Sequence, residues 1–484
     1  MKKSSPRVSL IAFTPDPQRV STAAARLSYK EGNATDIFNS TPRGGQEDFL
    51  SRVVRMGHSS VIEHSSFTFA IENVSVLVEQ FLIEFRLASF TVKSRRYVDY
   101  SEAGFIVPRI LPEPELPLFP GLATSYPYII PEIEEKGLYR RYISVMQFLF
   151  DTYRRLTKAG IPQEDARFVL PYSFKTNLFL TANTREMMNI ISQAIYGRGK
   201  NFPEIRWVGK RLLEEMQKLI PCIFSNLGNL IEKPAEDDFI HKLSREHKLT
   251  RSEGEKPTVE LLSYTPDPER VVFTAAVMEK SIGDTERIKN LYTEEFFEKV
   301  LDSILCSRRE RALEQASFSF RIGGISLPAL THIARHRMQS PVIPSLADVG
   351  KSENFVIPET IKKRKELLHL YKEAFRRSES LYKKFLASRV PKETAIYTYL
   401  SGNTTDIITT MNARELYHFF GLRTCNRAQW EIKVVADRML VLVKGVAPVI
   451  FKKAGPRCIR LGYCPEGKKS CGKLDEVRKR YSEI

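Results

Sequence analysis

The tripeptide Arg335-His336-Arg337 combines side chains that could bind an anion and move a proton. A guanidinium offers paired donors to a phosphate or carboxylate, and a histidine changes its charge near neutral pH. A basic run is also typical of a solvated helix end, and the tripeptide alone does not distinguish the two interpretations.

A second group of reactive side chains lies near the end of the chain. Cys458, Cys464 and Cys471 follow a Cys-x5-Cys-x6-Cys spacing, with glycines between them. Three thiolates could hold zinc with a fourth ligand from elsewhere, but the spacing is not the usual Cys-x2-Cys, and free thiols are the alternative. The other cysteines are scattered, which predicts reduced, buried thiols: Cys222, Cys306 and Cys425.

Generic cofactor motifs do not occur in the chain. It contains no Gly-x-Gly-x-x-Gly after a strand, no phosphate-binding Gly-x4-Gly-Lys-Ser/Thr loop and no His-Glu-x-x-His. Dinucleotide dehydrogenases, P-loop enzymes and zinc proteases of that kind are therefore disfavoured.

An internal repeat organises the sequence. Thr-Pro-Asp-Pro occurs at 14–17 and again at 265–268, an offset of 265 − 14 = 251. Phe67-Thr68-Phe69 and Phe318-Ser319-Phe320 keep the same offset. A register held by several motifs indicates duplication. We expect a first repeat at 1–232, a polar linker at 233–256, a second repeat at 257–455 and a cysteine-containing tail at 456–484.

Each repeat shows the same order of expected elements. Strands are predicted at 8–13 and 66–71, and at 259–264 and 317–322, where phenylalanines alternate. Long amphipathic helices are predicted around 142–156 and 367–385, where apolar residues recur at three- and four-residue spacing. The fold class is therefore α+β, with helices gathered on a sheet.

Charge and hydropathy bound the environment and the partners. The 484 residues carry a net charge of +17, which favours anionic partners such as phosphate-rich small molecules and does not exclude nucleic acid. No run of eighteen apolar residues and no signal-peptide core is present, so we expect no membrane span and a cytoplasmic location.

Taken together, the motifs of both halves resemble the family of flavin-dependent thymidylate synthases. The second half has Arg-His-Arg followed by Ser340, then Asn412-Ala413-Arg414, Arg423 and Ala-Gln-Trp-Glu-Ile at 428–432. The first half has Gly-His-x4-Glu-His at 57–64 and Ser94-Arg95-Arg96-Tyr97. The resemblance implies two fused copies of the family fold, a mixed sheet with helices, arranged as a pseudo-dimer.

The departures from the family pattern are complementary. In the first half, Glu84-Phe85-Arg86 replaces Arg-His-Arg, and Ala194, or Arg198 after an insertion, stands where the second half has Arg423. In the second half, Ser345-Leu346-Ala347-Asp348 replaces the Ser-x-Arg-Tyr loop, and Ile396 stands where the first has Arg167. We therefore predict composite sites to which both repeats contribute, while the reciprocal combination is inactive.

The resemblance implies reductive methylation of dUMP to dTMP, with FAD bound and with NADPH and methylene-tetrahydrofolate as co-substrates. Arg423 is the catalytic residue it implies. FAD would be held by Arg335, His336, Arg337, Asn412, Arg414, Ser60, Asn183 and Asn189. Substrate would be held by Ser94, Arg95, Arg96, Tyr97 and Arg167. A homodimer forming a pseudo-tetramer is the implied assembly.

Two other functions stay open at this point. One is methylation of another uracil-containing substrate, including RNA, which the basic charge and the loss of one phosphate pocket suggest. The other is a non-catalytic flavin- or nucleotide-binding protein, which the incomplete motifs of both halves suggest. A flavin spectrum and a dUMP assay would separate the three.

Overall fold

The computed structural model describes most of the chain. The exceptions are residues 1–4, 46, 108–122, 126–135, 231–242, 244–256, 281–282, 308, 346, 348–353 and 484. Except for Leu243, the expected linker 233–256 therefore lies outside the described residues, as do Leu346 and Asp348 of the altered loop. The chain divides into two compact units: residues 1–250, 345–352 and 357–402 form unit 1, and residues 251–344, 353–356 and 403–484 form unit 2.

Unit 1 begins with one four-stranded sheet and its helices. Its elements in the first repeat are β1 (Arg7–Phe13), α1 (Pro17–Leu27), α2 (Ala34–Ser40), α3 (Glu47–Arg55), the 3-10 helix η1 (Ser59–His64), β2 (Ser66–Ser75), α4 (Val76–Leu82), β3 (Ser89–Val92), β4 (Phe105–Val107), β5 (Ala123–Ser125), α5 (Lys136–Lys158), α6 (Gln163–Ala166), η2 (Arg167–Val169), β6 (Lys175–Asn183), α7 (Thr184–Ile195), α8 (Pro203–Leu219), α9 (Pro221–Phe224) and α10 (Leu227–Leu230). Those from the second repeat are α16 (Glu359–Lys362), α17 (Lys365–Ala387), α18 (Lys392–Ala395) and η5 (Ile396–Thr398).

Unit 2 repeats this order without the long helix. Its elements are β7 (Thr258–Tyr264), α12 (Pro268–Met278), α13 (Thr285–Asn290), α14 (Glu294–Cys306), η3 (Arg311–Gln315), β8 (Ser317–Ser326), α15 (Leu327–Ala334), β9 (Gln339–Val342), β10 (Thr404–Asn412), α19 (Ala413–Arg423), α20 (Trp430–Val446), α21 (Arg457–Leu461), η6 (Gly467–Lys469) and α22 (Leu474–Ser482).

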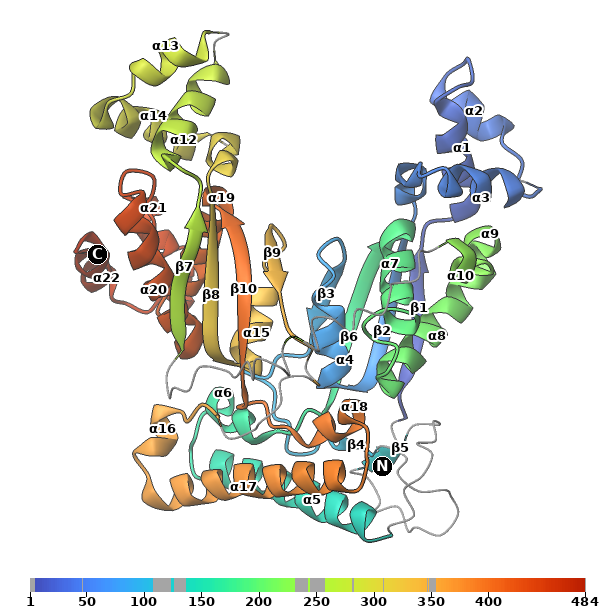
Figure 1. The fold of residues 1–484 in the computed structure, drawn as a ribbon, viewed down its shortest axis with the longest axis vertical. Coiled ribbons are helices and arrows are strands. Elements are labelled where there is room, and N and C mark those ends of the chain that lie inside the picture. The colour runs from blue at the N-terminus through green and yellow to red at the C-terminus, as the bar shows by residue number, and fades with distance from the viewer. Residues whose placement is uncertain are drawn as a thin grey trace. The chain divides into compact units, whose positions relative to one another are not determined.

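The two four-stranded sheets have the same topology. Their strand orders are β1-β2-β6-β3 and β7-β8-β10-β9 (Figure 1). Every pairing within them is antiparallel, so among the described strands the mixed character expected from the sequence is confined to the short parallel pair β4–β5. The α+β class, the four predicted strands and both long helices are confirmed. The sequence analysis missed β6 and β10, the central partners of β2 and β8.

Local hydrogen bonds are duplicated along with the topology. The backbone N–H of Ser75 donates to Glu204 over 2.7 Å, and that of Ser326 donates to Glu431 over 2.8 Å. Each serine also caps the helix that follows its strand, α4 or α15. The same buried serine–glutamate pair therefore forms the N-terminus of the corresponding helix in both repeats.

The long helix of the second repeat belongs to unit 1, where it packs along α5 (Figure 1). The rings of Tyr142 and Phe385 stack with centroids 6.0 Å apart, and the Arg377 guanidinium lies 3.9 Å from the centre of the Phe148 ring. The Tyr397 hydroxyl donates to buried Glu204. The compact units therefore do not coincide with the repeats, because helix packing unites residues that the duplication separates.

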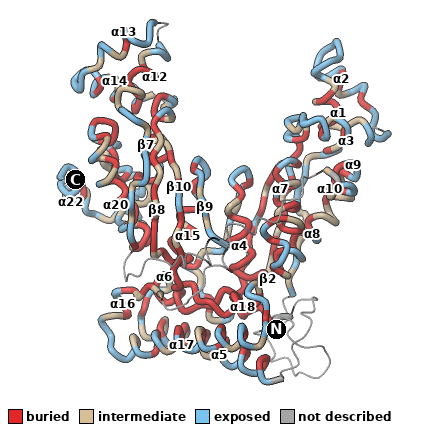
Figure 2. Tube along the Cα trace, in the orientation of Figure 1, coloured by how far each residue is buried: buried red, intermediate tan, exposed pale blue. Residues whose placement is uncertain are grey.

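The core of unit 2 lies between its sheet and helices. Alternate residues of β8, Phe318, Phe320 and Ile322, are fully buried, as the phenylalanine alternation predicted. They form one cluster with apolar residues of α19 and α20, including Phe420 and Met439 (Figure 2). This packing fixes the two ends of α19, which carry most of the site described below. In the described part of the chain, no helix has the length and apolar character that crossing a membrane requires.

Candidate functional site

A buried histidine links the predicted Arg-His-Arg segment to the two ends of α19. His336 lies in the turn between α15 and β9 and is 3% exposed. Its Nδ1 is 2.8 Å from Glu415 Oε1, in the first turn of α19. Arg423, the last residue of α19, donates from Nε to His336 Nε2 over 3.0 Å and from Nη2 to the His332 carbonyl over 3.1 Å.

These contacts determine the protonation of His336. A guanidinium only donates, so Nε2 must accept, and the ring proton lies on Nδ1 and faces Glu415. Burial lowers the pKa of His336, and the nearby Arg423 charge acts in the same direction, against the raising effect of Glu415. His336 is therefore neutral at pH 7, and it holds the Arg423 guanidinium in one orientation.

The other predicted flavin residues of the second repeat surround the N-terminal end of α19. Asn412 caps the helix by accepting from the Glu415 backbone N–H over 2.9 Å. Arg414 pairs with Glu314. Arg335 and Arg337 are exposed on either side of His336.

A cavity of about 560 Å³ opens at this end of α19. Arg414, Tyr417 and His418 line it from the helix, Asn412 from the end of β10, and Arg457 from α21. Three glutamates also line it: Glu310, Glu314 and Glu415. A cavity of this size accommodates part of a small-molecule ligand. Because a helix N-terminus and its flanking arginines attract negative charge, the donors present fit a phosphorylated cofactor.

His336, Glu415 and His418 also form a group with the composition of a metal site. One donor atom from each lies within 4.8 Å of the others. Both nitrogens of His336 already have hydrogen-bond partners, Glu415 and the cationic Arg423. A metal ion would have to break the hydrogen bond between His336 and Glu415 beside the cationic Arg423. The short distances within the group are therefore explained by hydrogen bonding.

The first repeat has different residues at the corresponding positions. Phe85 stands at the position of His336, and Glu84 pairs with Arg198, whose guanidinium lies 5.0 Å and 5.5 Å from the ring centres of Phe81 and Phe85. Burial raises the pKa of Glu84, and Arg198 opposes that effect. Ala194 occupies the helix position of Arg423, because α7 and α19 follow the corresponding strands β6 and β10 of the two sheets in the same register.

The remaining predicted flavin residues lie in the first repeat, at the end of β6 and on α7 and η1. Asn183 caps α7 by accepting from the Glu186 backbone N–H over 2.9 Å. Asn189 donates to Glu186 over 3.3 Å. Ser60 is exposed on η1. Their assignment to the flavin stays a prediction.

Two residues of the predicted substrate group meet at Glu164. Arg96 pairs with the Glu164 carboxylate, and Arg167 Nε donates to the Glu164 carbonyl over 2.9 Å. The Ser94 hydroxyl accepts from the Arg96 backbone N–H over 3.2 Å and shapes the turn, while Tyr97 is 73% exposed.

Arg95 differs from the rest of the substrate group. Its side chain is 4% exposed and pairs with Glu79 over 2.7 Å, and Glu79 also accepts from Thr176 over 2.8 Å. The burial and the carboxylate partner anchor the loop through Arg95. Its assignment to the substrate stays a prediction.

The sequence analysis missed Glu415, which fixes the tautomer of His336. A readable signal existed, because Asn412-x-x-Glu415 and Asn183-x-x-Glu186 both match the spacing of a helix-capping pair. The partnership with His336 was not readable, since 415 − 336 = 79 residues separate the two.

The cysteines correct one prediction. All six are unbonded, and Cys222 is buried as expected. Cys306 is exposed and Cys425 is partly exposed, so neither is a buried core thiol. The reason is local: Cys306 ends α14 on a solvent-facing side, and Cys425 lies in the turn after α19.

A helix N-terminus that opens on a cavity is a common binding site for anions. Comparison with known families identifies the group. The family described as "Thymidylate synthase complementing protein" matches residues 9–222 and 260–449. The chain therefore belongs to this family, twice over, and the resemblance seen in the sequence is confirmed.

Individual relatives agree with the family match. The chain is 40% identical over 230 residues to "Flavin-dependent thymidylate synthase" from Geobacter sulfurreducens, covering 47% of this chain and 98% of that protein. It is 38% identical over 241 residues to the protein of the same name from Clostridium tetani, covering 46% and 96%.

A solved structure also matches half of the chain. It is that of a UMP/dUMP methylase PolB from Streptomyces cacaoi bound with 5-Br dUMP, with 24% identity, 48% of this chain and 98% of that chain covered, and a TM-score of 0.37. A score at this level supports no conclusion about substrate.

Proposed function

We propose that the chain methylates dUMP to dTMP reductively, with FAD as its bound flavin, NADPH as reductant and methylene-tetrahydrofolate as carbon donor. The family supports the reaction type, and its relatives are named for it. The observation that carries the proposal is the hydrogen bond from Arg423 to neutral His336, which holds the guanidinium in one orientation at the C-terminal end of α19.

The residues at the cavity fit a flavin dinucleotide. Asn412 and the N-terminal end of α19 would face its pyrophosphate, with Arg414 and Arg457 as cationic partners. FAD, when bound, carries hydride between NADPH and the transferred carbon. The chain contributes binding, orientation and electrostatics.

The role of Arg423 is electrostatic. Carbon 5 of uracil becomes nucleophilic as negative charge develops on the pyrimidine, and a guanidinium beside the ring stabilises that charge. His336 cannot supply a proton in its neutral form without losing its bond to Glu415, so we assign it to positioning Arg423.

The phosphate of dUMP needs a cation that the second repeat does not offer at the corresponding loop. There the loop has Ala347 where the first repeat has Arg96. A buried dianion without a cationic partner is costly. We propose that Arg96 and Arg167 of one repeat and Arg423 of the other serve the same nucleotide, in a homodimer that forms a pseudo-tetramer.

The test begins with the flavin spectrum of the purified protein, followed by a dTMP assay with dUMP, methylene-tetrahydrofolate and NADPH. UMP replaces dUMP in a parallel reaction. Faster methylation of UMP, or of uracil in RNA, would support the other methyltransferase function instead. A bound flavin with no methylation of either nucleotide would support the non-catalytic alternative.

A matched variant tests whether only one of the two combinations of repeats forms an active site. Arg198→Ala removes the arginine that the first repeat pairs with Glu84, and it should leave dTMP formation largely unchanged in protein shown to be folded by circular dichroism. A loss as large as that of Arg423→Ala would mean that both combinations of repeats are active.

A further inference from the structure

The first part of the tail that follows the second repeat, before the buried residues of α22, has almost no apolar interior. Between residues 457 and 476 no residue is buried, and neither α21 nor η6 contributes a buried side chain. The partly shielded residues of this stretch are Cys458, Ile459, Cys464, Cys471 and Leu474. A segment with so small a core usually needs a disulfide or a metal to keep a fixed structure. Here the shielded positions are mainly occupied by sulfur.

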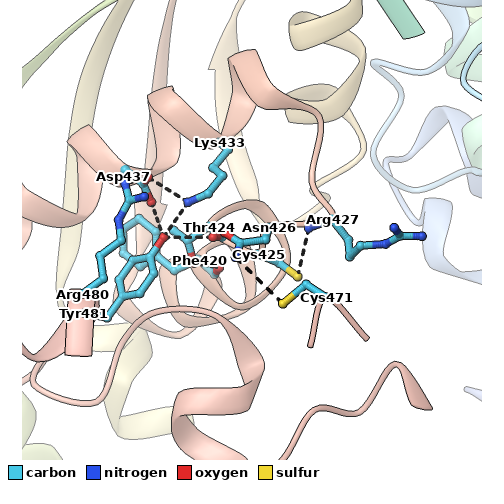
Figure 3. A network of polar contacts seen from close by, with 10 residues as sticks. All are labelled: Phe420, Thr424, Cys425, Asn426, Arg427, Lys433, Asp437, Cys471, Arg480 and Tyr481. Atoms are coloured by element: carbon cyan, nitrogen blue, oxygen red, sulfur yellow. Dashed lines mark hydrogen bonds and ion pairs between the residues drawn. The ribbon is translucent and has the colours of Figure 1, made fainter. Parts of the chain in front are cut away.

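A fourth thiol lies against the tail from the turn after α19. The Arg427 backbone N–H donates to Cys425 Sγ over 3.5 Å, and Asn426 Nδ2 lies 3.9 Å from Cys471 Sγ. Figure 3 shows Cys425 on this turn and Cys471 on the tail, with their sulfur atoms directed toward the same region. N–H groups directed at sulfur stabilise a thiolate, as they do around bound metals.

Cys458 and Cys464 complete the group. α21, which carries Cys458, packs against α19. Burial raises the pKa of the Cys458 thiol, and negative charge on Cys425, Cys464 and Cys471 raises it further, so all three lie within electrostatic reach. Binding of a metal cation would require these thiols to lose their protons, so metal binding and proton release are coupled.

We propose that Cys425, Cys458, Cys464 and Cys471 form a structural zinc site that fastens the tail to the end of α19. Zinc binds four thiolates in a closed tetrahedron with Zn–S distances of about 2.3 Å. In the described part of the chain no three of these sulfurs lie within 4.8 Å of one another. Binding of the ion would therefore require the cysteine side chains to rotate toward a common centre. Metal binding of this kind is coupled to local folding.

The surrounding charge suits such a site. One divalent ion with four thiolates carries 2 − 4 = −2 charges, and the intervening segment supplies exposed Lys468, Lys469 and Lys473. Because Cys425 follows Arg423 by two residues, the ion would also fix the end of the helix that carries the proposed catalytic arginine. The metal site itself does not depend on the proposed reaction.

Metal analysis of the full-length protein tests the proposal. The chain is produced with zinc supplied, purified without chelators, and analysed by mass spectrometry for zinc and iron. We expect about one zinc per chain, released when a mercurial reagent has titrated four thiols. Cys458→Ser and Cys425→Ser should each lose the zinc, while Cys306→Ser, at an exposed cysteine outside the group, should retain it.

A second measurement covers variants that fold poorly. Cobalt exchanged into the wild-type protein should give the intense visible absorption of a tetrahedral tetrathiolate site. Negligible zinc in the wild type, iron in its place, or disulfides among these cysteines in unreduced protein would each overturn the proposal. Unchanged zinc in Cys425→Ser would overturn the four-cysteine assignment.

Discussion

At the scale of single residues, the two repeats differ at one aromatic position, which is His336 in the second repeat and Phe85 in the first, and in the partners of that side chain. His336 in the second repeat accepts from Arg423 and faces Glu415, whereas Phe85 in the first repeat accepts from nothing and packs against Arg198. A histidine thus orients the guanidinium of Arg423. In the first repeat, where Phe85 stands beside Glu84, the guanidinium of Arg198 is instead paired with the Glu84 carboxylate.

The first prediction separates the two arginines of the proposed composite site. Arg423→Ala should lower kcat by a factor of about 100 or more with a modest change in dUMP affinity, because it acts on charge that develops in the transition state. Arg96→Ala should mainly weaken dUMP binding, because the phosphate charge does not change during the reaction. Single-turnover kinetics and equilibrium binding of dUMP measure the two effects. Identical effects of both substitutions on binding and turnover would contradict this division.

The second prediction concerns pH. Folding lowers the pKa of His336 below its unfolded-state value of about 6.5. As the pH falls, His336 is therefore protonated in the unfolded chain before it is protonated in the folded chain. The stabilisation that His336 provides is present above the unfolded-state pKa and is lost as the pH falls through the folded-state pKa. Denaturant unfolding between about pH 5 and pH 8 should therefore show a smaller acid destabilisation in His336→Phe, the residue of the first repeat, than in the wild type. An equal pH dependence would show that His336 does not titrate on unfolding.

At the scale of elements, α19 is held at both of its ends. Its N-terminus is capped by Asn412, and the turn after its C-terminus is held by α22 through Tyr481 (Figure 3). The buried Tyr481 hydroxyl lies 2.9 Å from the Thr424 carbonyl, 2.6 Å from Asp437 Oδ1 and 2.8 Å from Lys433 Nζ. The tail therefore supports the helix that carries Glu415 and Arg423.

The third prediction tests that support. Tyr481→Phe removes the hydroxyl and leaves buried polar partners without it, which should lower the free energy of unfolding by about 1–3 kcal/mol. Tyr463→Phe is the matched control, because Tyr463 is 61% exposed and its hydroxyl should contribute little. Chemical denaturation of both variants gives the comparison, and an equal, small effect would contradict the role of Tyr481.

At the scale of the whole molecule, the duplication and the compact units divide the chain differently. Residues 357–402 belong to the second repeat by sequence and to unit 1 by packing. The Ser401 backbone N–H donates to the Leu170 carbonyl over 2.8 Å, and the Tyr172 backbone N–H donates to the Tyr399 carbonyl over 2.6 Å. The first repeat thus completes its own unit only with a segment of the second.

The fourth prediction follows from this exchange. Residues 1–256 produced alone should aggregate, because the face of α5 that packs on α17 would be exposed. Co-production with residues 257–484 should restore a soluble complex on size-exclusion chromatography. As a control, the full chain carrying a protease site within 233–256 should remain one complex after cleavage. A monomeric, cooperatively unfolding 1–256 fragment would contradict the exchange.

The sequence by itself determined the duplication, the α+β class, two strands and the long helix of each repeat, and the Arg-His-Arg segment. These follow from local periodicity and from motifs that keep a register, both of which are written in neighbouring residues. It did not determine β6 and β10, in which polar and apolar residues are mixed, so that pairing with β2 and β8 defines them.

Only the tertiary structure decided which side chains meet. Glu415 and Arg423 belong to one helix, and their bonds to His336 depend on a turn about eighty residues away in the chain. The same holds for Cys425, which the sequence classed with buried core thiols and the fold places beside Cys471. Packing also assigned α17 to unit 1, because an apolar helix face binds whichever complementary face the fold brings to it, whether or not the two are close in the sequence.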